Sequence, residues 1–443
     1  MNMRHTTIML ALALCGRAVA QEGQAPLVLS LKQAMDLAGK QSYQVQASDL
    51  EREKANAKVK EITALGLPQV DGSASLNNYI KVPTSVVPNF FDPNAGLLEV
   101  QFGVPWSTTG ALALNQLIFD GSYLVGLQAS KELRVRSEQE LERTAADARY
   151  QAAKGYLGVL AAREGSRLAA ESVPVLEKSL AEARAMTEQG FMEATDVDRL
   201  SIALASARDR ARSFAQQERV ALAFLRLVLG VPEGTPLELT DQLETLLNDP
   251  AEVALSEAPL DMSGHIDHQL ANTLVRLQTL EVKNQKSAYL PKLYGFFNTQ
   301  AQSFGENGPA ETDWFPATLW GAQLQVPLFS SGLRSNRVKQ SELSLMQTEV
   351  NLTATEQRLL AEAAERSEKA RTALETYTTE KQNLDLAKRI FDRTSIKFTN
   401  GLSSSFELNQ DQTQYLTAQQ MYINALVNLA LARTDLRKAL DLY

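Results

Sequence analysis

The sequence predicts a mixed α+β fold built from two copies of one unit. Each copy runs helix, strand, loop, strand, long helix, turn, helix. Three observations support this prediction. Three short landmarks recur in the same order along the chain, and two very long stretches have the periodicity of helices. The 443 residues also include only 15 Pro and 23 Gly, so we expect long uninterrupted elements joined by few turns.

The three repeated landmarks define the two copies. "GLPQV" at 66–70 returns as "YLPKL" at 289–293, and "LIFDG" at 117–121 returns as "PLFSSG" at 327–332. "EQGFMEATDVDRL" at 188–200 returns as "TNGLSSSFELNQD" at 399–411. The first copy is longer only within residues 81–107, a segment rich in Pro and Asn that we expect to form a long exposed loop. We therefore predict a first repeat over 21–250 and a second over 251–443.

Each repeat is predicted to place two strands after its first helix. A helix over about 31–65 should break near Gly39 and stop before Pro68, because proline lacks the amide hydrogen. Strands are expected near 69–80 and 108–119, and again near 292–302 and 317–329. The last of these alternates apolar and polar residues, which suits either a barrel strand between lipid and water or a half-buried strand in a soluble sheet. The apolar face holds Trp320, Ala322, Leu324 and Val326, and the other holds Gly321, Gln323 and Gln325.

The long helices are predicted over 122–188 and 334–399. Pro174 should kink or loosen the first of them. Apolar residues at spacings of three and four form a packing stripe along the second. Each long helix should reverse at a glycine, Gly190 or Gly401, into a returning helix over 194–229 or 404–442. Each half of the chain then contains a helical hairpin with coiled-coil packing.

The N-terminus resembles a secretory signal peptide over residues 1–20. A short polar region with Arg4 and His5 precedes an apolar run, and "AVA" at 18–20 suits a cleavage site. The only cysteine is Cys15, so cleavage after residue 20 would leave no thiol and no disulfide. A lipoprotein signal would instead lipidate Cys15, although Leu14 does not fit a typical lipobox.

Charge and hydropathy limit the classes of partner. Removal of Arg4 and Arg17 with the signal leaves 42 basic against 52 acidic side chains, which argues against nucleic acid. No later stretch supplies the roughly 20 apolar residues of a transmembrane helix. Any membrane crossing is therefore expected to use β-strands.

Catalytic and metal-binding patterns are weak in this sequence. It has no Gly-rich phosphate loop, nucleophile elbow or zinc motif, so we predict neither an enzyme nor a cofactor. His265 and His268 in "HIDH" have a spacing at which both could touch one metal ion. Their place near a predicted helix start favours a surface or capping role instead.

Taken together, these residues resemble the TolC family of outer-membrane efflux and secretion channels. The resemblance rests on the opening "LSLKQAMDLAGKQSYQV" at 29–45, the paired "LPQV" and "LPKL", the paired "LIFDG" and "PLFSSG", and the two glycine turns. It implies a homotrimer in the outer membrane of a Gram-negative bacterium. Each protomer would give four strands to a shared twelve-stranded transmembrane β-barrel, continuous with an α-helical periplasmic barrel.

The resemblance also implies a function. The chain would be the exit duct of a tripartite efflux pump or a type I secretion system. It would passively conduct substrate delivered by an inner-membrane transporter of RND, ABC or MFS type and a periplasmic adaptor (membrane fusion) protein. Drug efflux, metal efflux and protein secretion all remain open. The alternative is a periplasmic adaptor or a coiled-coil structural protein, but an adaptor would have one hairpin rather than two complete units.

Family resemblance assigns the gate and the adaptor-docking surface to the two hairpin turns. Asp196 and Glu407 match acidic positions at the closed end, although Asp196 also suits a helix N-terminus. Gln410 stands where some members have a second acid, and Phe398 stands where some have an aromatic gate partner. Phe398 lacks a hydroxyl, which implies weaker or differently arranged gate hydrogen bonds. The candidate residues are Gly190, Thr195, Asp196, Val197, Phe398, Gly401, Glu407, Leu408 and Gln410.

The same resemblance marks two junctions where strand changes to helix. They are Phe119 with Gly121 in the first repeat, and Phe329 with Gly332 in the second. We expect glycine to relax the backbone limits at both junctions.

Overall fold

The computed structural model describes residues 26–88, 96–247, 255 and 258–443. The predicted signal peptide, including Cys15, lies outside these residues. The chain divides into two compact units. We call Met1–Ala38, Gln151–Asp249 and Thr379–Val427 the tip unit, and Gly39–Tyr150, Pro250–Thr378 and Asn428–Tyr443 the sheet unit. Each unit takes segments from both halves of the sequence.

Most of the described chain is helical. The helices are α1 Leu31–Gln41, α2 Tyr43–Ala64, α3 Gly121–Glu188, α4 Ala194–Leu229, α5 Leu243–Leu247, α7 Ile266–Ser287, α8 Leu333–Thr399 and α9 Ser405–Ala439. The predicted bounds of α4 are confirmed, and those of α3 and α8 differ by one residue at the start. Within the described residues, no helix combines the length and hydrophobicity that a membrane span requires.

One detail of the helices differs from the prediction. The first helix breaks at Ser42 rather than Gly39, because the Ser42 side chain accepts a hydrogen bond from the Val45 amide and caps α2. Gly39 lies inside α1, where an added Cβ would come 2.7 Å from Arg149 Nε, so its small size permits close packing. α3 stays helical through Pro174, which lies between the buried Ser172 and Leu176.

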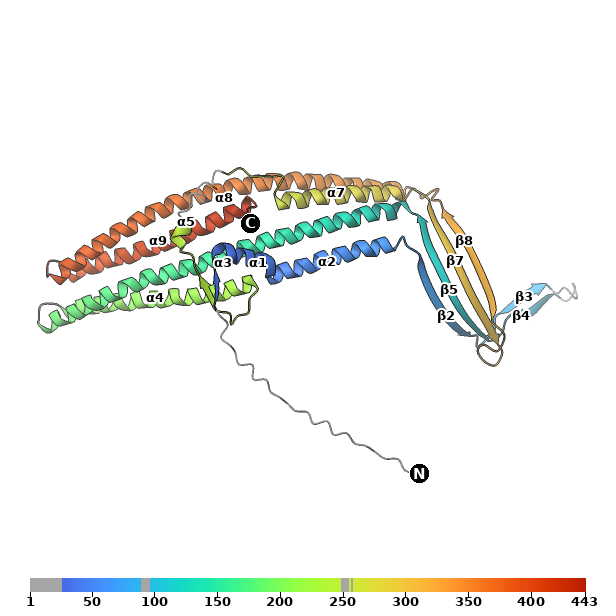
Figure 1. The fold of residues 1–443 in the computed structure, drawn as a ribbon, viewed down its shortest axis with the longest axis horizontal. Helices are drawn as coiled ribbons and strands as arrows, with labels where there is room; N and C mark the ends of the chain where they lie inside the picture. The colour runs from blue at the N-terminus through green and yellow to red at the C-terminus, as the bar shows by residue number, and fades with distance from the viewer. Residues whose placement is uncertain (1–25, 89–95, 248–254, 256–257) are drawn as a thin grey trace, which may run out of the picture. The chain divides into compact units, whose positions relative to one another are not determined.

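The main sheet belongs to the sheet unit and has the order β2-β5-β7-β8 (Figure 1). All three pairings are antiparallel. The pair from the first repeat therefore lies beside the pair from the second. β8 ends at Gln325, earlier than predicted, and Pro327 follows without an amide hydrogen for a ladder. The strand bounds are β2 Gln69–Asn78, β5 Trp106–Phe119, β7 Lys292–Gly305 and β8 Phe315–Gln325.

Part of the predicted loop over 81–107 is a β-hairpin. β3, Thr84–Pro88, pairs with β4, Leu97–Gln101, with Thr84 opposite Gln101 (Figure 1). The segment between the two strands lies outside the described residues. The Pro and Asn content suggested a loop, but Val86, Val87 and Val100 favour extended structure. The prediction of an irregular loop was therefore wrong for these strands.

A smaller parallel pair holds the start of the described chain in the tip unit. β1, Leu27–Leu29, pairs with β6, Leu237–Leu239. The buried Tyr156 donates its hydroxyl to the Leu29 carbonyl and to Asp241 Oδ2, both at 2.9 Å. The same carboxylate oxygen accepts the Leu31 amide at 2.6 Å and so caps α1.

Candidate gate and strand–helix junctions

The two hairpin turns have the same backbone conformation. Gly190 has φ 78° and Gly401 has φ 72°, in the left-handed region that favours glycine. The amide of Phe191 donates to the Met186 carbonyl at 2.9 Å, and the amide of Leu402 donates to the Lys397 carbonyl at 2.8 Å. These are Schellman motifs, which satisfy the last carbonyls of α3 and α8. Both predicted turn glycines therefore end a long helix.

Each turn presents an apolar side chain to solvent directly after its glycine. Phe191 is 81% exposed and Leu402 is 77% exposed. Their positions correspond in the two landmarks that define the repeat. Two large apolar side chains at equivalent exposed positions indicate a contact surface at the turns.

Asp196 connects the first hairpin to the second. It lies in the first turn of α4, where its Oδ1 accepts a hydrogen bond from the hydroxyl of Ser405 on α9. Arg199 also approaches the carboxylate, at 3.3 Å. The N-cap of α4 is Glu193, so Asp196 adds favourable charge near the helix start without occupying the cap position. Thr195, by contrast, donates to Glu193 at 3.2 Å, within its own turn.

The other predicted gate residues divide into packing and surface positions. Phe398 and Leu408 are 2% and 1% exposed, so they form the core of the second hairpin. Glu407 accepts from the Ser403 hydroxyl at 2.7 Å within its own turn. Gln410 is exposed and Val197 is partly buried. The structure therefore places Asp196 and Glu407 in separate local networks.

Ser405 is the site residue that sequence reasoning missed. Its hydroxyl donates to Asp196. Phe398, the predicted aromatic gate residue, has no hydroxyl that could do so. Ser405 ends the run "SSS" at 403–405 and is the first residue of α9, whose first turn also contains an acidic residue. A hydroxyl at a helix start is a recognisable signal, but it predicts a cap rather than a bond to a residue about 200 positions earlier.

Further polar contacts join the two hairpins within the tip unit. Gln419 Nε2 donates to the Leu168 carbonyl at 3.2 Å. Arg210 donates to the Leu416 carbonyl at 3.3 Å, and Thr399 donates to Glu182 at 3.4 Å. These contacts run from α3 and α4 to α8 and α9. The hairpins thus meet partly through polar groups.

Asp120 organises the first strand–helix junction. It is 8% exposed, and its carboxylate pairs with Lys292 at 2.8 Å and accepts the Ser122 amide at 2.8 Å. Burial alone would raise the pKa of Asp120, but the hydrogen bonds from Lys292 and Ser122 outweigh it and hold the pKa below its ordinary value. Sequence reasoning named its neighbours Phe119 and Gly121 but missed Asp120, although an Asp directly before a helix is a cap signal.

The junction glycines have different roles. Gly332 has φ 81°, so it provides the predicted backbone freedom. At Gly121 an added Cβ would lie 2.7 Å from Leu290 Cδ1 and 3.1 Å from Ser287 Cβ. Gly121 therefore permits close approach of two segments, and the prediction of backbone freedom was wrong there. The adjacent aromatic residues Phe119 and Phe329 are 38% and 87% exposed.

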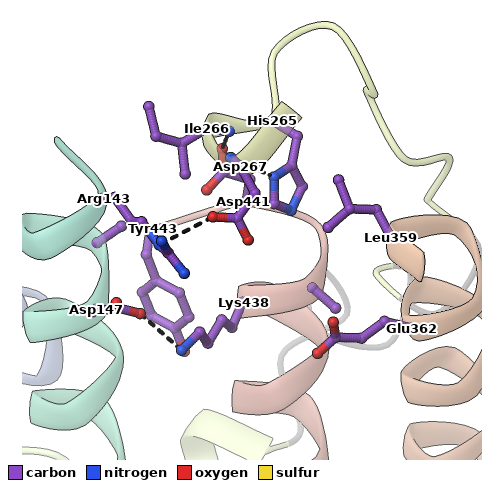
Figure 2. A pocket seen from close by; sticks show the side chains of 12 residues that line it. Arg143, Asp147, His265, Ile266, Asp267, Leu359, Glu362, Lys438, Asp441 and Tyr443 are labelled. Atoms are coloured by element: carbon purple, nitrogen blue, oxygen red, sulfur yellow. Dashed lines mark hydrogen bonds and ion pairs between the residues drawn. The ribbon is translucent and has the colours of Figure 1, made fainter. Parts of the chain in front are cut away.

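The predicted capping role of His265 is confirmed. Its Nδ1 accepts the Asp267 amide at 3.2 Å, and Asp441 accepts the Ile266 amide at 2.7 Å, so α7 begins with two of its amides satisfied. A cavity of about 70 Å³ lies beside this helix start, and two ion pairs, Arg143–Asp267 and Lys438–Asp147, line it (Figure 2). His268 instead contacts Glu356 at 3.1 Å. In the described part of the chain, no group of three potential ligands could hold a metal ion.

Comparisons with known proteins agree with this architecture. Residues 34–231 and 268–441 match the family model described as outer membrane efflux protein. The fold is similar to the outer membrane channel CmeC of Campylobacter jejuni, with a TM-score of 0.70 at 17% identity over 93% of this chain and 85% of that chain. The fold is also similar to the outer membrane protein VceC of Vibrio cholerae, with a TM-score of 0.70 at 14% identity over 93% of this chain and 95% of that chain.

A third similar structure is the open state of the MtrE outer membrane channel of Neisseria gonorrhoeae. It gives a TM-score of 0.67 at 14% identity over 93% of this chain and 88% of that chain. A comparison with curated proteins finds no match to this sequence.

We predict that Asp120→Asn destabilises the junction in a pH-dependent way. Because the folded pKa of Asp120 lies below the ordinary value of 3.8, its stabilisation is present above that pH and is lost as the pH falls through the folded pKa. At pH 7 the variant should lose about 1.5–3 kcal/mol of unfolding free energy, as for hydrogen bonds to a charged group. At pH 2 the difference from the unmodified protein should shrink. Denaturant unfolding in detergent at both pH values measures it.

Asp209→Asn is the control for Asp120→Asn. Asp209 pairs with Arg212, and both side chains are more than two-thirds exposed, so its replacement should change stability by less than about 1 kcal/mol. An Asp120→Asn penalty of equal size at pH 7 and pH 2 would contradict a role for the carboxylate charge.

Proposed function

Because the chain belongs to the outer membrane efflux protein family, we propose that it is the exit duct of a tripartite efflux pump or a type I secretion system. Its family is one of channels in the outer membrane of Gram-negative bacteria, with a large periplasmic portion. An inner-membrane transporter of RND, ABC or MFS type would deliver the substrate through a periplasmic adaptor protein. The duct itself would conduct passively. The family match covers both repeats, which a single-hairpin adaptor would not explain.

The observation that carries this proposal is the open sheet. Within the described residues, β2 and β8 each have a strand partner on one side only. Their outer edges present unpaired N–H and C=O groups, which lipid cannot satisfy. Pairing β8 of one copy with β2 of the next would close the sheet into a barrel. Two copies would supply eight strands, and side chains fill the interior of a barrel of that size. Three copies would supply twelve strands and leave a lumen.

Exposed apolar side chains support the membrane location of this sheet. On β8, Trp320 is 82% exposed and Leu324 is 62% exposed, whereas Gln323 and Gln325 alternate with them. An apolar face that covers no core within its own chain suits lipid, and the alternating polar face suits an aqueous lumen.

The packing stripe of α8 independently supports association with further copies of the chain. Its later members are buried, as Tyr377 and Leu384 show at 4% and 9% exposure. Its earlier members Leu343, Met346 and Val350 are 52%, 55% and 67% exposed. An apolar stripe that is covered along only part of one helix is suited to a neighbouring copy. The twelve-stranded barrel and the helical tube would then be completed by the same association.

The gate would lie at the hairpin turns. The Asp196–Ser405 hydrogen bond ties the first hairpin to the second, and the buried Phe398 and Leu408 hold the second hairpin together. A hydrogen bond to a charged group contributes about 1.5–3 kcal/mol, so binding of a partner could offset its loss. A bond of this strength suits a closure that an adaptor opens. The neighbour MtrE, of the same fold, is described in an open state.

The adaptor would dock on the same turns. Phe191 and Leu402, next to Gly190 and Gly401, offer exposed apolar area at equivalent positions of the two hairpins. Val197 lies in the first turn of α4, and the exposed Gln410 lies in the second turn of α9. A docking surface that spans both hairpins would link adaptor binding to their separation.

We predict that Ser405→Ala raises the single-channel conductance of the detergent-extracted trimer in planar bilayers. The substitution removes the hydroxyl that binds Asp196 without changing the charge at the turn. Asp196→Ala should have a larger effect in the same direction, because it also releases Arg199. Thr195→Ala is the matched control, since that hydroxyl bonds only within its own turn. Unchanged conductance in both gate variants of a well-folded trimer would show that closure lies elsewhere.

We also predict that Phe191→Ser with Leu402→Ser weakens adaptor binding. Burial of a Phe or Leu side chain contributes about 1.5–3 kcal/mol, so the double variant should bind at least 10-fold more weakly. Binding to the purified adaptor from the same cell measures the effect. Leu50→Ser on α2, where the side chain is 66% exposed, is the control. Docking at the turns would be refuted by an affinity equal to that of the control.

A further inference from the structure

The buried face of α9 follows a heptad pattern along the whole helix. Core positions recur at alternating spacings of three and four, and all of them are buried. This is the geometry of a coiled-coil seam, with two rows of core residues. One row contains Ser405, Gln412, Gln419, Leu426, Arg433 and Leu440, and the other contains Leu408, Tyr415, Tyr422, Leu429 and Leu436.

The first row is polar near the hairpin turn. Ser405, Gln412 and Gln419 are spaced seven residues apart, and apolar Leu426 follows. We call these three residues the polar row. The second row is apolar or aromatic over the same length.

The two rows face different helices. In the polar row, Ser405 donates to Asp196 on α4, and Gln419 donates to the Leu168 carbonyl on α3. In the other row, the Tyr415 ring stacks on Phe391 of α8, with centroids 5.5 Å apart. The polar row therefore lies between the two hairpins, and the apolar row holds the second hairpin together.

Gln412, in the middle of the polar row, has no partner. It is 2% exposed, and both its Nε2 and its Oε1 are buried without a hydrogen bond. A buried amide that has lost its hydrogen bonds to water and has no protein partner destabilises the state in which it is buried. On α3, Ser172 is 3% exposed, and its hydroxyl is likewise buried without a partner.

The register of the helices places these two groups near one another. The Gln419–Leu168 bond fixes how α9 lies against the antiparallel α3. Moving seven residues along each helix from this bond leads to Gln412 and to Val175, which therefore stand at the same level. Ser172 lies less than one turn before Val175, and a turn rises about 5.4 Å. A shift of α9 along α3 by less than one turn would bring the hydroxyl to the amide.

We propose that Gln412 is a built-in opening element of the gate. With the hairpins packed as described, its amide is unsatisfied. When α9 shifts on α3, the Gln419–Leu168 bond is lost, but the Gln412 amide meets the Ser172 hydroxyl, so a new hydrogen bond offsets that loss. Gln412 thereby lowers the free energy that a partner must supply to open the turns. This inference rests on the gate proposed above and adds the residue that opposes its closure.

Positions farther along the same row show which side chains occupy the seam away from the hairpin turn. Leu426 occupies the same row and is 1% exposed; Arg433 follows it, and Leu440, directly after the end of α9, is 8% exposed. A leucine at 412 would remove the unsatisfied amide and keep an apolar side chain in the seam. Polar residues at such core positions reduce stability and set the arrangement of the helices.

The test compares Gln412→Leu with Gln419→Leu in the full-length trimer. Gln419 belongs to the same row and is 4% exposed, but its amide has a partner, so it is the matched control. Gln412→Leu should raise the Tm by a few degrees and lower the open fraction roughly 5- to 30-fold, whereas Gln419→Leu should lower the Tm. If Gln412→Leu lowers the Tm as well, its amide has a partner such as a buried water, and the proposal is overturned.

Ser172→Ala tests the proposed partner. The hydroxyl is buried and unpaired in the packed state, so the variant should raise the Tm slightly and lower the open fraction. Combined with Gln412→Leu it should add nothing further, since both substitutions remove the same bond. Additive effects on the open fraction would reject Ser172 as the partner.

Two measurements distinguish failure of the duct proposal from failure of the opening-element proposal. Spin labels at Phe191→Cys and Leu402→Cys, in trimers with one labelled chain, report the separation of the turns without any conductance. Bilayer conductance of the unmodified protein tests the duct itself. A bilayer that stays silent with both the unmodified protein and Asp196→Ala would refute the duct. A fraction of separated turns that Gln412→Leu leaves unchanged would refute the opening element.

Discussion

In the part of the chain that the structure describes, the outer edges of β2 and β8 are unpaired, and this is the constraint on which the remaining structure depends. Each backbone N–H and C=O on these edges needs a partner, and lipid offers none. One chain alone therefore leaves its sheet incomplete, which accounts for the exposure of all ten residues of β2. In the proposed assembly, the association that pairs these edges would also cover the exposed early stripe of α8. In the proposed assembly, the sheet and the helices therefore use the same partner, a second copy of the chain.

Within the tip unit, polar and apolar contacts have different roles. Apolar and aromatic groups hold each hairpin together, as the Phe391–Tyr415 stack and the buried Phe398 show. Hydrogen bonds to Asp196 and Leu168 hold the hairpins to one another. Separating apolar cores costs far more than exchanging a few hydrogen bonds with water. Each hairpin can therefore remain intact while the interface between hairpins changes.

Much of the fold was predictable because the chain is duplicated. The repeated glycine turns located the ends of α3 and α8 at Glu188 and Thr399, since a left-handed glycine stops a helix at a defined residue. The β3–β4 hairpin was missed because its prolines outweighed its valines. The Ser405–Asp196 bond and the unpaired Gln412 amide depend on how α9 lies against α3 and α4. Such a register joins residues about 200 positions apart and leaves no local pattern.

The strand–helix junctions show how the two copies keep one backbone with different side chains. In the first copy, Tyr123 of α3 reaches over Gly66 and donates to the Thr63 carbonyl at 3.1 Å; an added Cβ on Gly66 would lie 2.2 Å from the tyrosine oxygen. In the second copy, the aromatic ring belongs to Tyr289, and Arg334 of α8 lies 5.2 Å from its centroid. In the first copy the aromatic ring lies after the strand pair and faces a glycine before it. In the second copy the ring lies before the strand pair and faces an arginine after it. The space between the two helices is filled in both copies, so substitutions on either side of a junction are coupled to the residue opposite.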